Sequence, residues 1–378
     1  MKIEVFEMER FQCANENDVE LNLSESGVKP LRVRELLDDD EDITSFLGEE
    51  LGYPDPPGSA ELRSHIASWY PTATVDNVTV TNGGAEANFL AAWTLLESDA
   101  QLAFMLPNYM QGWGLGRYFA AEANPYRLVH DRSAGRWALD VDSLRAAVGP
   151  MTSVIWVCNP NNPTGAVLTS SEMEAIVEAA SSVDAWIVSD EIYRGAELDE
   201  DVDTPTFWGM YERTVVTSGL SKAFGLPGLR LGWLVAPTEL IPRLWEHRDY
   251  TTIMVGRLSD ALASRTLEPN KREQLLRRTR SIVRDHVQVA DEWAASNSNL
   301  ITYVRPKAGA IAYFEYEASI DSLELAELVR RKQSVLVVPG VQLGLERGFR
   351  VGFGHDANKT REGLSRLGEI LRQSEGAR

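Results

Sequence analysis

The chain has 378 residues, 44% of them hydrophobic, and a formal net charge of −19 at pH 7. This length allows two domains or one large α/β unit, and the acidity argues against a nucleic-acid partner, because a phosphate backbone demands a basic surface. The sequence has no uncharged apolar run of about 18 residues, so we expect no transmembrane helix and no membrane partner.

Through the middle of the chain, short apolar segments alternate with stretches of helical pattern. Strands that alternate with helices imply right-handed crossovers and a mostly parallel sheet. The strands are near-continuous apolar runs, as a sheet covered on both faces requires. Strands are predicted over 77–82, 101–106, 153–159, 185–190, 213–219 and 230–237, and helices over 84–96, 111–121 and 170–182.

From about residue 240 the pattern changes to long helices, and short strands then return before a closing helix. This change predicts a large domain over 46–265 and a smaller α/β domain made of 1–45 and 266–378. The first 45 residues are assigned to the smaller domain because they precede the sheet and hold one short strand segment. The segments concerned are a strand in 19–24, a helix at 271–296, strands at 301–306, 309–317, 334–340 and 348–354, and a helix at 358–373.

Small and polar residues follow the carboxyl ends of successive predicted strands. Each of them alone is ordinary turn or helix-cap chemistry. In an open parallel sheet, however, ligands bind outside the carboxyl ends of the strands, so their occurrence at one strand end after another predicts a shared site. The residues are Gly84, Ala85, Tyr109, Asn162, Asp190, Tyr193, Ser221 and Lys222.

One kind of cofactor would use all of these groups. A pyridine ring that bears an aldehyde needs an amine to hold the aldehyde, a carboxylate to keep its nitrogen protonated, and an aromatic face for stacking. Its phosphate needs backbone N–H groups at a helix N-terminus and an arginine. These requirements describe pyridoxal 5′-phosphate.

Three motifs stand in the order and spacing of a known family. They are "GLSKAFGLPGLRLG" (219–232), "NPNNPTG" (159–165) and "SDEIYRG" (189–195). With them, and with "YPDPPGSAELR" (53–63) and "FRVGFG" (349–354), the chain resembles the class I/II aminotransferases over nearly its whole length. The resemblance implies an α/β protein with the fold-type I architecture of pyridoxal-phosphate transferases, and a homodimer with shared active sites.

The resemblance also implies a role for residues around the cofactor ring. Lys222 would form the Schiff base with the cofactor and then move the substrate Cα proton as general base. Asp190 would pair with the ring nitrogen, and Tyr109 would stack on the ring. Asn162 and Tyr193 would hydrogen bond to the phenolic oxygen.

Other residues would hold the phosphate and the substrate. Gly84 and Ala85 would offer backbone N–H groups to the phosphate, and Arg230 would grip it. Tyr53 would reach the phosphate of the neighbouring subunit. The substrate-binding residues would be Arg350, which binds the α-carboxylate, Asn162 and Gly27.

Two positions depart from the family pattern. Gly219 stands where a serine often donates to the phosphate, and either Ser218 or Ser221 could replace that serine. The segment "SESGV" (24–28) resembles the branch that includes capreomycidine synthase, and substrate identity is expected to be encoded around Ser26, Gly27 and Lys29.

The sequence therefore leaves two enzymatic functions open. We favour an aminotransferase that moves an amino group from an α-amino acid to a 2-oxo acid by a ping-pong mechanism. The alternative is a pyridoxal-phosphate lyase or cyclase, similar to capreomycidine synthase, that acts on a substituted amino acid. A non-catalytic DNA-binding sensor is disfavoured by the acidity of the chain.

Composition also suggests a setting. The basic residues are 30 Arg and only 7 Lys, against 56 acidic residues, which is typical of adaptation to high salt and predicts a halophilic host. The N-terminus lacks the basic and apolar regions of a secretory signal, so we expect a cytoplasmic protein. Two cysteines, Cys13 and Cys158, and five histidines without ligand spacing predict no metal site.

Overall fold

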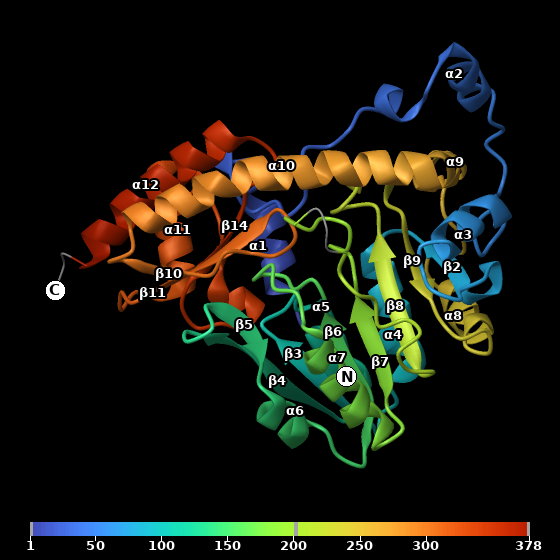
Figure 1. The fold of residues 1–378 in the computed structure, drawn as a ribbon, viewed down its shortest axis with the longest axis horizontal. Coiled ribbons are helices and arrows are strands. Elements are labelled where there is room, and N and C mark those ends of the chain that lie inside the picture. The colour runs from blue at the N-terminus through green and yellow to red at the C-terminus, as the bar shows by residue number, and fades with distance from the viewer. Residues whose placement is uncertain (1–2, 200–202, 376–378) are drawn as a thin grey trace.

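The computed structural model describes residues 3–199 and 203–375, and its centre is an eight-stranded sheet (Figure 1). Across the sheet the strand order is β2-β9-β8-β7-β6-β3-β4-β5. The strands are β2 (Val78–Thr81), β3 (Gln101–Leu106), β4 (Glu122–Asp131), β5 (Arg136–Leu139), β6 (Thr152–Cys158), β7 (Trp186–Asp190), β8 (Thr214–Gly219) and β9 (Gly232–Val235).

The five strands from β8 to β4 in this order run parallel to one another. Antiparallel pairs occur only towards the edges of the sheet, where β9 pairs with β8 and β2 and where β5 pairs with β4. The apolar strands in the middle are buried on both faces, which explains their continuous hydrophobic character. The prediction of a mostly parallel sheet is confirmed.

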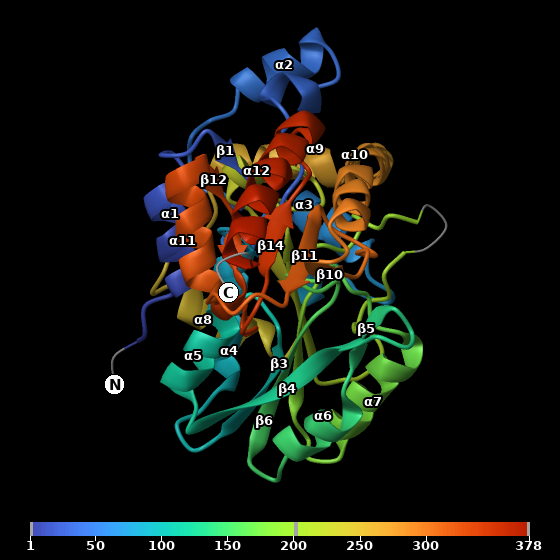
Figure 2. The ribbon, with the colours of Figure 1, turned by 90° about the vertical axis from the view of Figure 1, so that its left-hand side faces the viewer.

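Helices cover both faces of this sheet (Figure 2). On one face lie α4 (Gly84–Leu95), α5 (Gln111–Phe119) and α8 (Ile241–Arg248), and on the other lie α6 (Val141–Ala147) and α7 (Ser170–Ser181). The N-terminus of α7 is well defined, because Thr169 and Glu172 exchange the two hydrogen bonds of a capping box. Among the residues that the structure describes, no helix is both long and apolar enough to cross a bilayer.

A second sheet lies beside the first, with the strand order β10-β11-β14-β13. Its neighbouring strands are antiparallel. The long helix α10 (Pro269–Ser296) runs from this sheet to α9 (Arg257–Leu267) along the top of the molecule in Figure 1. The strands of the second sheet are β10 (Ile301–Tyr303), β11 (Ile311–Tyr316), β13 (Val338–Pro339) and β14 (Phe349–Gly352). Strand β12 (Val335–Leu336) and the helices α11 (Ser322–Gln333) and α12 (Ala357–Glu375) belong to the same part of the chain. Elsewhere lie α3 (Ala60–Ala67) and the short 3-10 turns η1 (Val33–Leu36), η2 (Val75–Asn77), η3 (Pro227–Leu229) and η4 (Gly340–Leu343).

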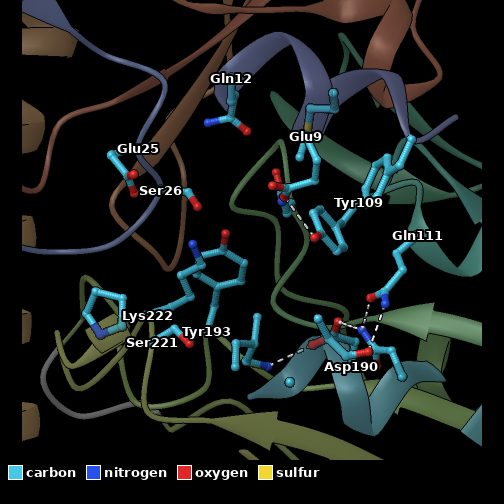
Figure 3. Close-up of a pocket in the computed structure, with 18 of the residues that line it drawn as sticks. Glu9, Gln12, Glu25, Ser26, Tyr109, Gln111, Asp190, Tyr193, Ser221 and Lys222 are labelled. Atoms are coloured by element: carbon cyan, nitrogen blue, oxygen red, sulfur yellow. Dashed lines mark hydrogen bonds between the residues drawn. The ribbon is translucent and has the colours of Figure 1, made fainter. Parts of the chain in front are cut away.

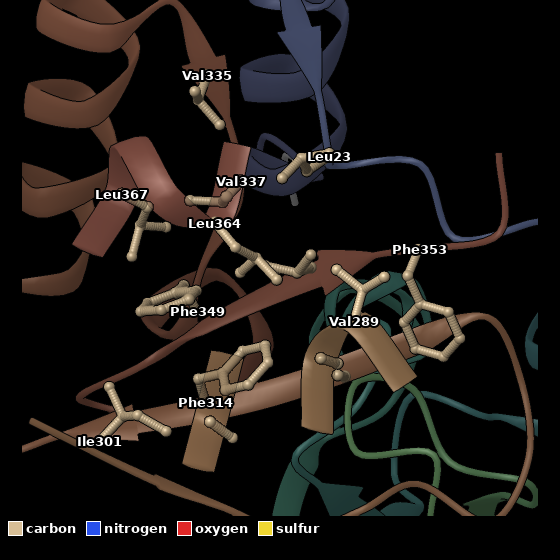
Figure 4. Close-up of a cluster of buried hydrophobic side chains, with 14 of the residues drawn as sticks. Leu23, Val289, Ile301, Phe314, Val335, Val337, Phe349, Phe353, Leu364 and Leu367 are labelled. Carbon is tan, nitrogen blue, oxygen red and sulfur yellow. The ribbon is translucent and has the colours of Figure 1, made fainter. Parts of the chain in front are cut away.

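The N-terminal segment forms a separate two-stranded sheet with β12 and packs against the second sheet. Strand β1 (Leu21–Asn22) pairs in parallel with β12, and the buried side chain of Leu23 joins a cluster that includes Val335 and Leu364 (Figure 4). Burying a side chain of this size contributes roughly 1.5–3 kcal/mol. The packing therefore fixes where the residues after Leu23 lie.

A glycine in β14 makes room for that segment. Gly352 donates its backbone N–H to the Leu23 carbonyl at 2.7 Å, and a Cβ on Gly352 would overlap the backbone carbonyl of Glu25. We expect Gly352→Ala to lower the free energy of unfolding by about 1–3 kcal/mol, because the backbone must shift. Urea unfolding checks this, with Gly114→Ala as control because a Cβ there meets no atom within 4 Å. Equal midpoints for Gly352→Ala and the wild type would contradict the expectation.

The first 45 residues contain more regular structure than the single predicted strand. Helix α1 (Glu7–Asn15) and helix α2 (Asp40–Leu47) were not predicted, and α2 lies apart from the main body (Figure 1). Helix α1 has a weak apolar period and buries only Met8, whereas the helical spacing of Ile43, Phe46 and Leu47 in α2 was overlooked. The division into domains at residues 45 and 265 stays a prediction.

Candidate active site

A cavity of about 720 Å³ opens at the carboxyl edge of the large sheet (Figure 3). Asp190 ends β7, and its Cα partners in the neighbouring strands are Cys158 and Thr217. The parallel strands thus deliver their end residues to one place, as expected of this kind of sheet. Ten of the twelve residues predicted to form the site line the cavity: Gly84, Ala85, Tyr109, Asn162, Asp190, Tyr193, Ser221, Lys222, Arg230 and Arg350.

The Asp190 carboxylate is buried and held by two donors. Its Oδ2 accepts from Asn88 Nδ2 at 3.0 Å, and its Oδ1 accepts from the Ile192 backbone N–H at 3.1 Å. Burial raises the pKa of this carboxyl, while the bonds from Asn88 and Ile192 and the charge of Lys222 act to lower it. Donors of this kind favour the ionised carboxylate.

Lys222 lies in the same cavity among small residues. Burial lowers the pKa of its ammonium group, the Glu25 carboxylate acts to raise it, and the charge of Arg350 lowers it again. A lowered pKa leaves more of the amine neutral and nucleophilic. Gly27 packs against this segment, since a Cβ on Gly27 would stand 3.2 Å from the Ser221 carbonyl oxygen. A larger residue at position 27 would crowd Lys222.

The start of α4 and Arg230 together form an anion-binding corner. Gly83 precedes the helix with φ of 85°, and a Cβ there would approach Arg230 Nη2 to 2.6 Å. Glycine therefore lets the guanidinium lie directly beside the helix N-terminus, where backbone N–H groups and the helix dipole favour an anion. Of the two candidate hydroxyls, Ser221 lines the cavity, whereas Ser218 donates to the Glu191 carbonyl at 3.2 Å and does not.

Arg350 is a second buried cation at the site. Only 1% of its surface is exposed, and its guanidinium donates to Asn162 Oδ1 at 3.0 Å and to the Ser24 carbonyl. Among the described residues, the Nε of Arg350 has no hydrogen-bond partner, and the Arg350 side chain forms no ion pair. Burial lowers the pKa of Arg350. A buried guanidinium without an ion-pair partner is costly, and a bidentate carboxylate would compensate it.

Two tyrosines lie near the middle of the cavity. Tyr109 donates from its hydroxyl to Glu9 Oε1 at 2.9 Å, and the ring of Phe6 meets its ring edge-on with centroids 5.0 Å apart. Tyr193 is buried, with 2% of its surface exposed. Burial raises the pKa of both phenols, so both hydroxyls remain hydrogen-bond donors at neutral pH.

Two predicted site residues do not line the cavity. Tyr53 is 92% exposed and lies outside it. Gly27 is buried behind Ser26, which does line the cavity, and Lys29 is exposed. The segment at 24–28 therefore reaches the site through Glu25 and Ser26.

Several residues of the cavity were not predicted from the sequence. Glu9 and Gln12 of α1 lie across the cavity from Lys222 (Figure 3). No local pattern places α1 there, because its position depends on long-range packing. Asn88 could have been found, since it lies four residues after Gly84 and hence on the same face of α4.

The residues present fit pyridoxal phosphate. The anion-binding corner at Arg230 suits a phosphate, the buried Asp190 suits a protonated ring nitrogen, and Lys222 supplies an amine in the same cavity. No group of three or more His, Cys, Asp or Glu residues that could hold a metal occurs in residues 3–199 and 203–375.

Comparison with known proteins agrees with this geometry. Residues 18–367 match the family model for aminotransferase class I and II. The chain is 28% identical over 333 residues to capreomycidine synthase from Streptomyces vinaceus. The aligned region covers 85% of this chain and 82% of that protein.

Solved structures of pyridoxal-phosphate enzymes are also similar. A PLP-dependent aminotransferase from Streptococcus suis superposes with a TM-score of 0.91 at 28% identity and covers 99% of both chains. The PLP-dependent cyclase OrfR gives a TM-score of 0.87 at 25% identity, with 99% of this chain and 98% of that chain covered. The chain therefore belongs to the class I and II aminotransferase family, with the fold-type I architecture and pyridoxal phosphate as its cofactor.

Proposed function

We propose that the protein is an aminotransferase that moves an amino group from an α-amino acid to a 2-oxo acid by a ping-pong mechanism. The observation that carries this proposal is that Lys222, Asp190 and Arg350 line one cavity. An amine, a buried carboxylate and a guanidinium that has no ion-pair partner among the described residues are the groups that transamination of an α-amino acid requires.

The residues around the ring would divide the work as follows. When bound, the cofactor supplies an electron-accepting ring that stabilises negative charge at the substrate Cα. Lys222 Nζ would hold the cofactor through its aldehyde carbon, and the freed amine would later take the proton from the substrate Cα. Asp190 would keep the ring nitrogen protonated, and Tyr109 would cover the ring. Tyr193 would donate its hydroxyl hydrogen to the phenolic oxygen of the cofactor.

Further residues position the two anionic groups. Gly84 and Ala85 offer backbone N–H groups to the phosphate, with Arg230 and the Ser221 hydroxyl beside them. Arg350 binds the substrate carboxylate in a fork, and its bond to Asn162 at 3.0 Å fixes the orientation of the guanidinium. The amino acid is thereby held with its Cα towards Lys222.

We further propose that the active unit is a homodimer with shared sites, in the cytoplasm of a halophilic host. Tyr53 supports the dimer because it is 92% exposed and outside its own cavity, as a residue that reaches a partner's phosphate must be. Leu51, two residues earlier, is 78% exposed. Such exposed apolar side chains favour an interface.

A lyase or cyclase that acts on a substituted amino acid is the second candidate. It is favoured by the similarity to capreomycidine synthase and to the cyclase OrfR, and by the segment at 24–28, which contributes Glu25 and Ser26 to the cavity. The same Lys222 would remove the Cα proton, and a substituent on the side chain would then leave with its bonding electrons, so that no amino group is transferred to the cofactor.

One experiment separates the two functions. The holoenzyme is incubated at high salt with a panel of amino acids and without a 2-oxo acid. An aminotransferase releases about one 2-oxo acid per protomer and resumes only when an acceptor is added. Continued release of ammonia or of a cyclised product without an acceptor would overturn the aminotransferase in favour of the second candidate.

The charge of Glu25 should set the pH at which the apoprotein takes up the cofactor. Burial lowers the pKa of Lys222 and Glu25 acts to raise it, so Glu25→Gln should lower that pKa further. The neutral amine is then present at lower pH, and the midpoint of covalent uptake against pH should move down. Absorbance titration at fixed ionic strength measures the midpoint, with Glu16→Gln as a control in the same cavity. A midpoint that stays or rises would contradict the expectation.

A further inference from the structure

We infer that Asn88 is a positioning residue of this site, which together with Thr217 and Gln111 holds Asp190 as an ionised carboxylate facing the cavity. The inference rests on the proposed role of Asp190 and adds the residues that make this role possible. Nothing in the family motifs points to position 88, and the contacts around its side chain carry the argument.

Asn88 is a polar residue on an otherwise apolar stretch of helix. It is only 4% exposed, and its neighbours on the buried side of α4 include Ala87, Leu90 and Ala91. Burying a carboxamide is unfavourable unless its hydrogen bonds are made. All of its groups are used, because both hydrogens of Nδ2 and the oxygen Oδ1 have partners.

The backbone carbonyl of Ala85 fixes which way the side-chain amides of Gln111 and Asn88 are turned. The Ala85 carbonyl can only accept, so Gln111 must present Nε2 to it, at 2.8 Å, and keep Oε1 on the other side. Gln111 Oε1 then accepts from Asn88 Nδ2 at 3.4 Å. The nitrogen of Asn88 therefore faces Gln111 and Asp190, and its oxygen faces Thr217 (Figure 3 shows Gln111 and Asp190).

Two further hydrogen bonds connect Thr217, Asn88 and Asp190. Asn88 Nδ2 donates to Asp190 Oδ2 at 3.0 Å, and Thr217 donates its hydroxyl to Asn88 Oδ1 at 2.6 Å. Thr217 is 1% exposed, and in the register of β7 and β8 it stands directly opposite Asp190. An amide fixed with its nitrogen towards Asp190 can only donate, and the Ile192 N–H donates to the other oxygen, so both oxygens accept and the ionised carboxylate is favoured.

This arrangement opposes the effect of burial, which raises the pKa of Asp190 while the hydrogen bond from Asn88 lowers it. Without Asn88, burial would favour the protonated acid, which could not hold a proton on the ring nitrogen. The deeper reason for asparagine at position 88 is therefore electrostatic, and an apolar residue of the same size would fill the space equally well.

The test compares binding of pyridoxal phosphate to apoprotein variants. Asn88→Leu has nearly the same volume and no donor, and we expect its cofactor dissociation constant to rise about 10- to 100-fold, because a hydrogen bond to a charged group is lost. Thr217→Val removes only the hydroxyl that orients Asn88, and we expect a smaller loss in the same direction. Thermal unfolding of the apoproteins serves as the control for folding.

A second readout separates positioning from packing. In Asn88→Leu, the pH midpoint of the absorbance of the bound cofactor should rise, because a ring nitrogen without its proton repels the proton at Lys222 Nζ less strongly. In an Asp190→Ala background, Asn88→Leu should cause no further loss of affinity.

Three results would overturn the inference. Wild-type affinity and an unshifted midpoint in Asn88→Leu would show that Asn88 does not act on the site. The same loss of affinity in the Asp190→Ala background would show that Asn88 acts independently of Asp190. A wild-type protein that takes up no pyridoxal phosphate would overturn the proposed function itself, and this inference with it.

Discussion

Replacing Lys222 by alanine should lower turnover at least about 1,000-fold, because the amine is both the point of attachment and the base for the Cα proton. The anion-binding corner formed by Arg230 and the start of α4 remains intact in this variant. The cofactor should therefore still bind, but reversibly and without the visible absorbance of the covalent adduct.

The matched control for this prediction is Lys359→Ala, which removes an exposed lysine at the start of α12. Its turnover and absorbance should equal those of the wild type. If Lys222→Ala kept more than about a tenth of the activity with an intact visible band, another lysine would have to carry the chemistry.

Replacing Asp190 by alanine should lower turnover about 1,000-fold, since preorganised charge in a water-excluded site is among the largest contributions to catalysis. The loss should appear in kcat, because Arg350 still binds the substrate carboxylate. Steady-state kinetics on the reconstituted variant measures it, and Asp142→Ala, whose side chain is 95% exposed, is the control.

A cofactor analogue makes this second prediction specific. Pyridoxal phosphate methylated on the ring nitrogen carries a permanent positive charge and does not need a carboxylate to keep a proton there. It should restore part of the activity of Asp190→Ala and none of the activity of Lys222→Ala. Equal failure with both variants would indicate that Asp190 serves the fold and not the ring nitrogen.

The parts of the fold that the sequence predicts are those with strong local patterns. The buried strands β6, β7 and β8 were predicted to within about two residues, because a sheet covered on both faces needs continuous apolar runs. Strands β4 and β5, on one side of the sheet, were missed, since their alternating, half-exposed residues and Pro125 give no such signal.

The residues of the site likewise fall into those that the sequence predicts and those that it does not. Residues at strand ends, such as Asp190 and Lys222, could be predicted because topology alone brings strand ends together. Glu9 of α1 could not, because its approach to Tyr109 depends on how the chain folds back over 100 residues of sequence separation. Glu25 reaches the cavity only because β1 pairs with β12.

One lysine, Lys222, should hold the cofactor in this cavity. Reduction of the holoenzyme with borohydride, followed by protease digestion and mass spectrometry, tests it most directly, since reduction fixes the cofactor on the nitrogen that carries it. A phosphopyridoxyl group on the peptide that contains Lys222, and on no other of the 7 lysines, is the predicted result. Modification of a different lysine, or of none, would show that Lys222 does not hold the cofactor.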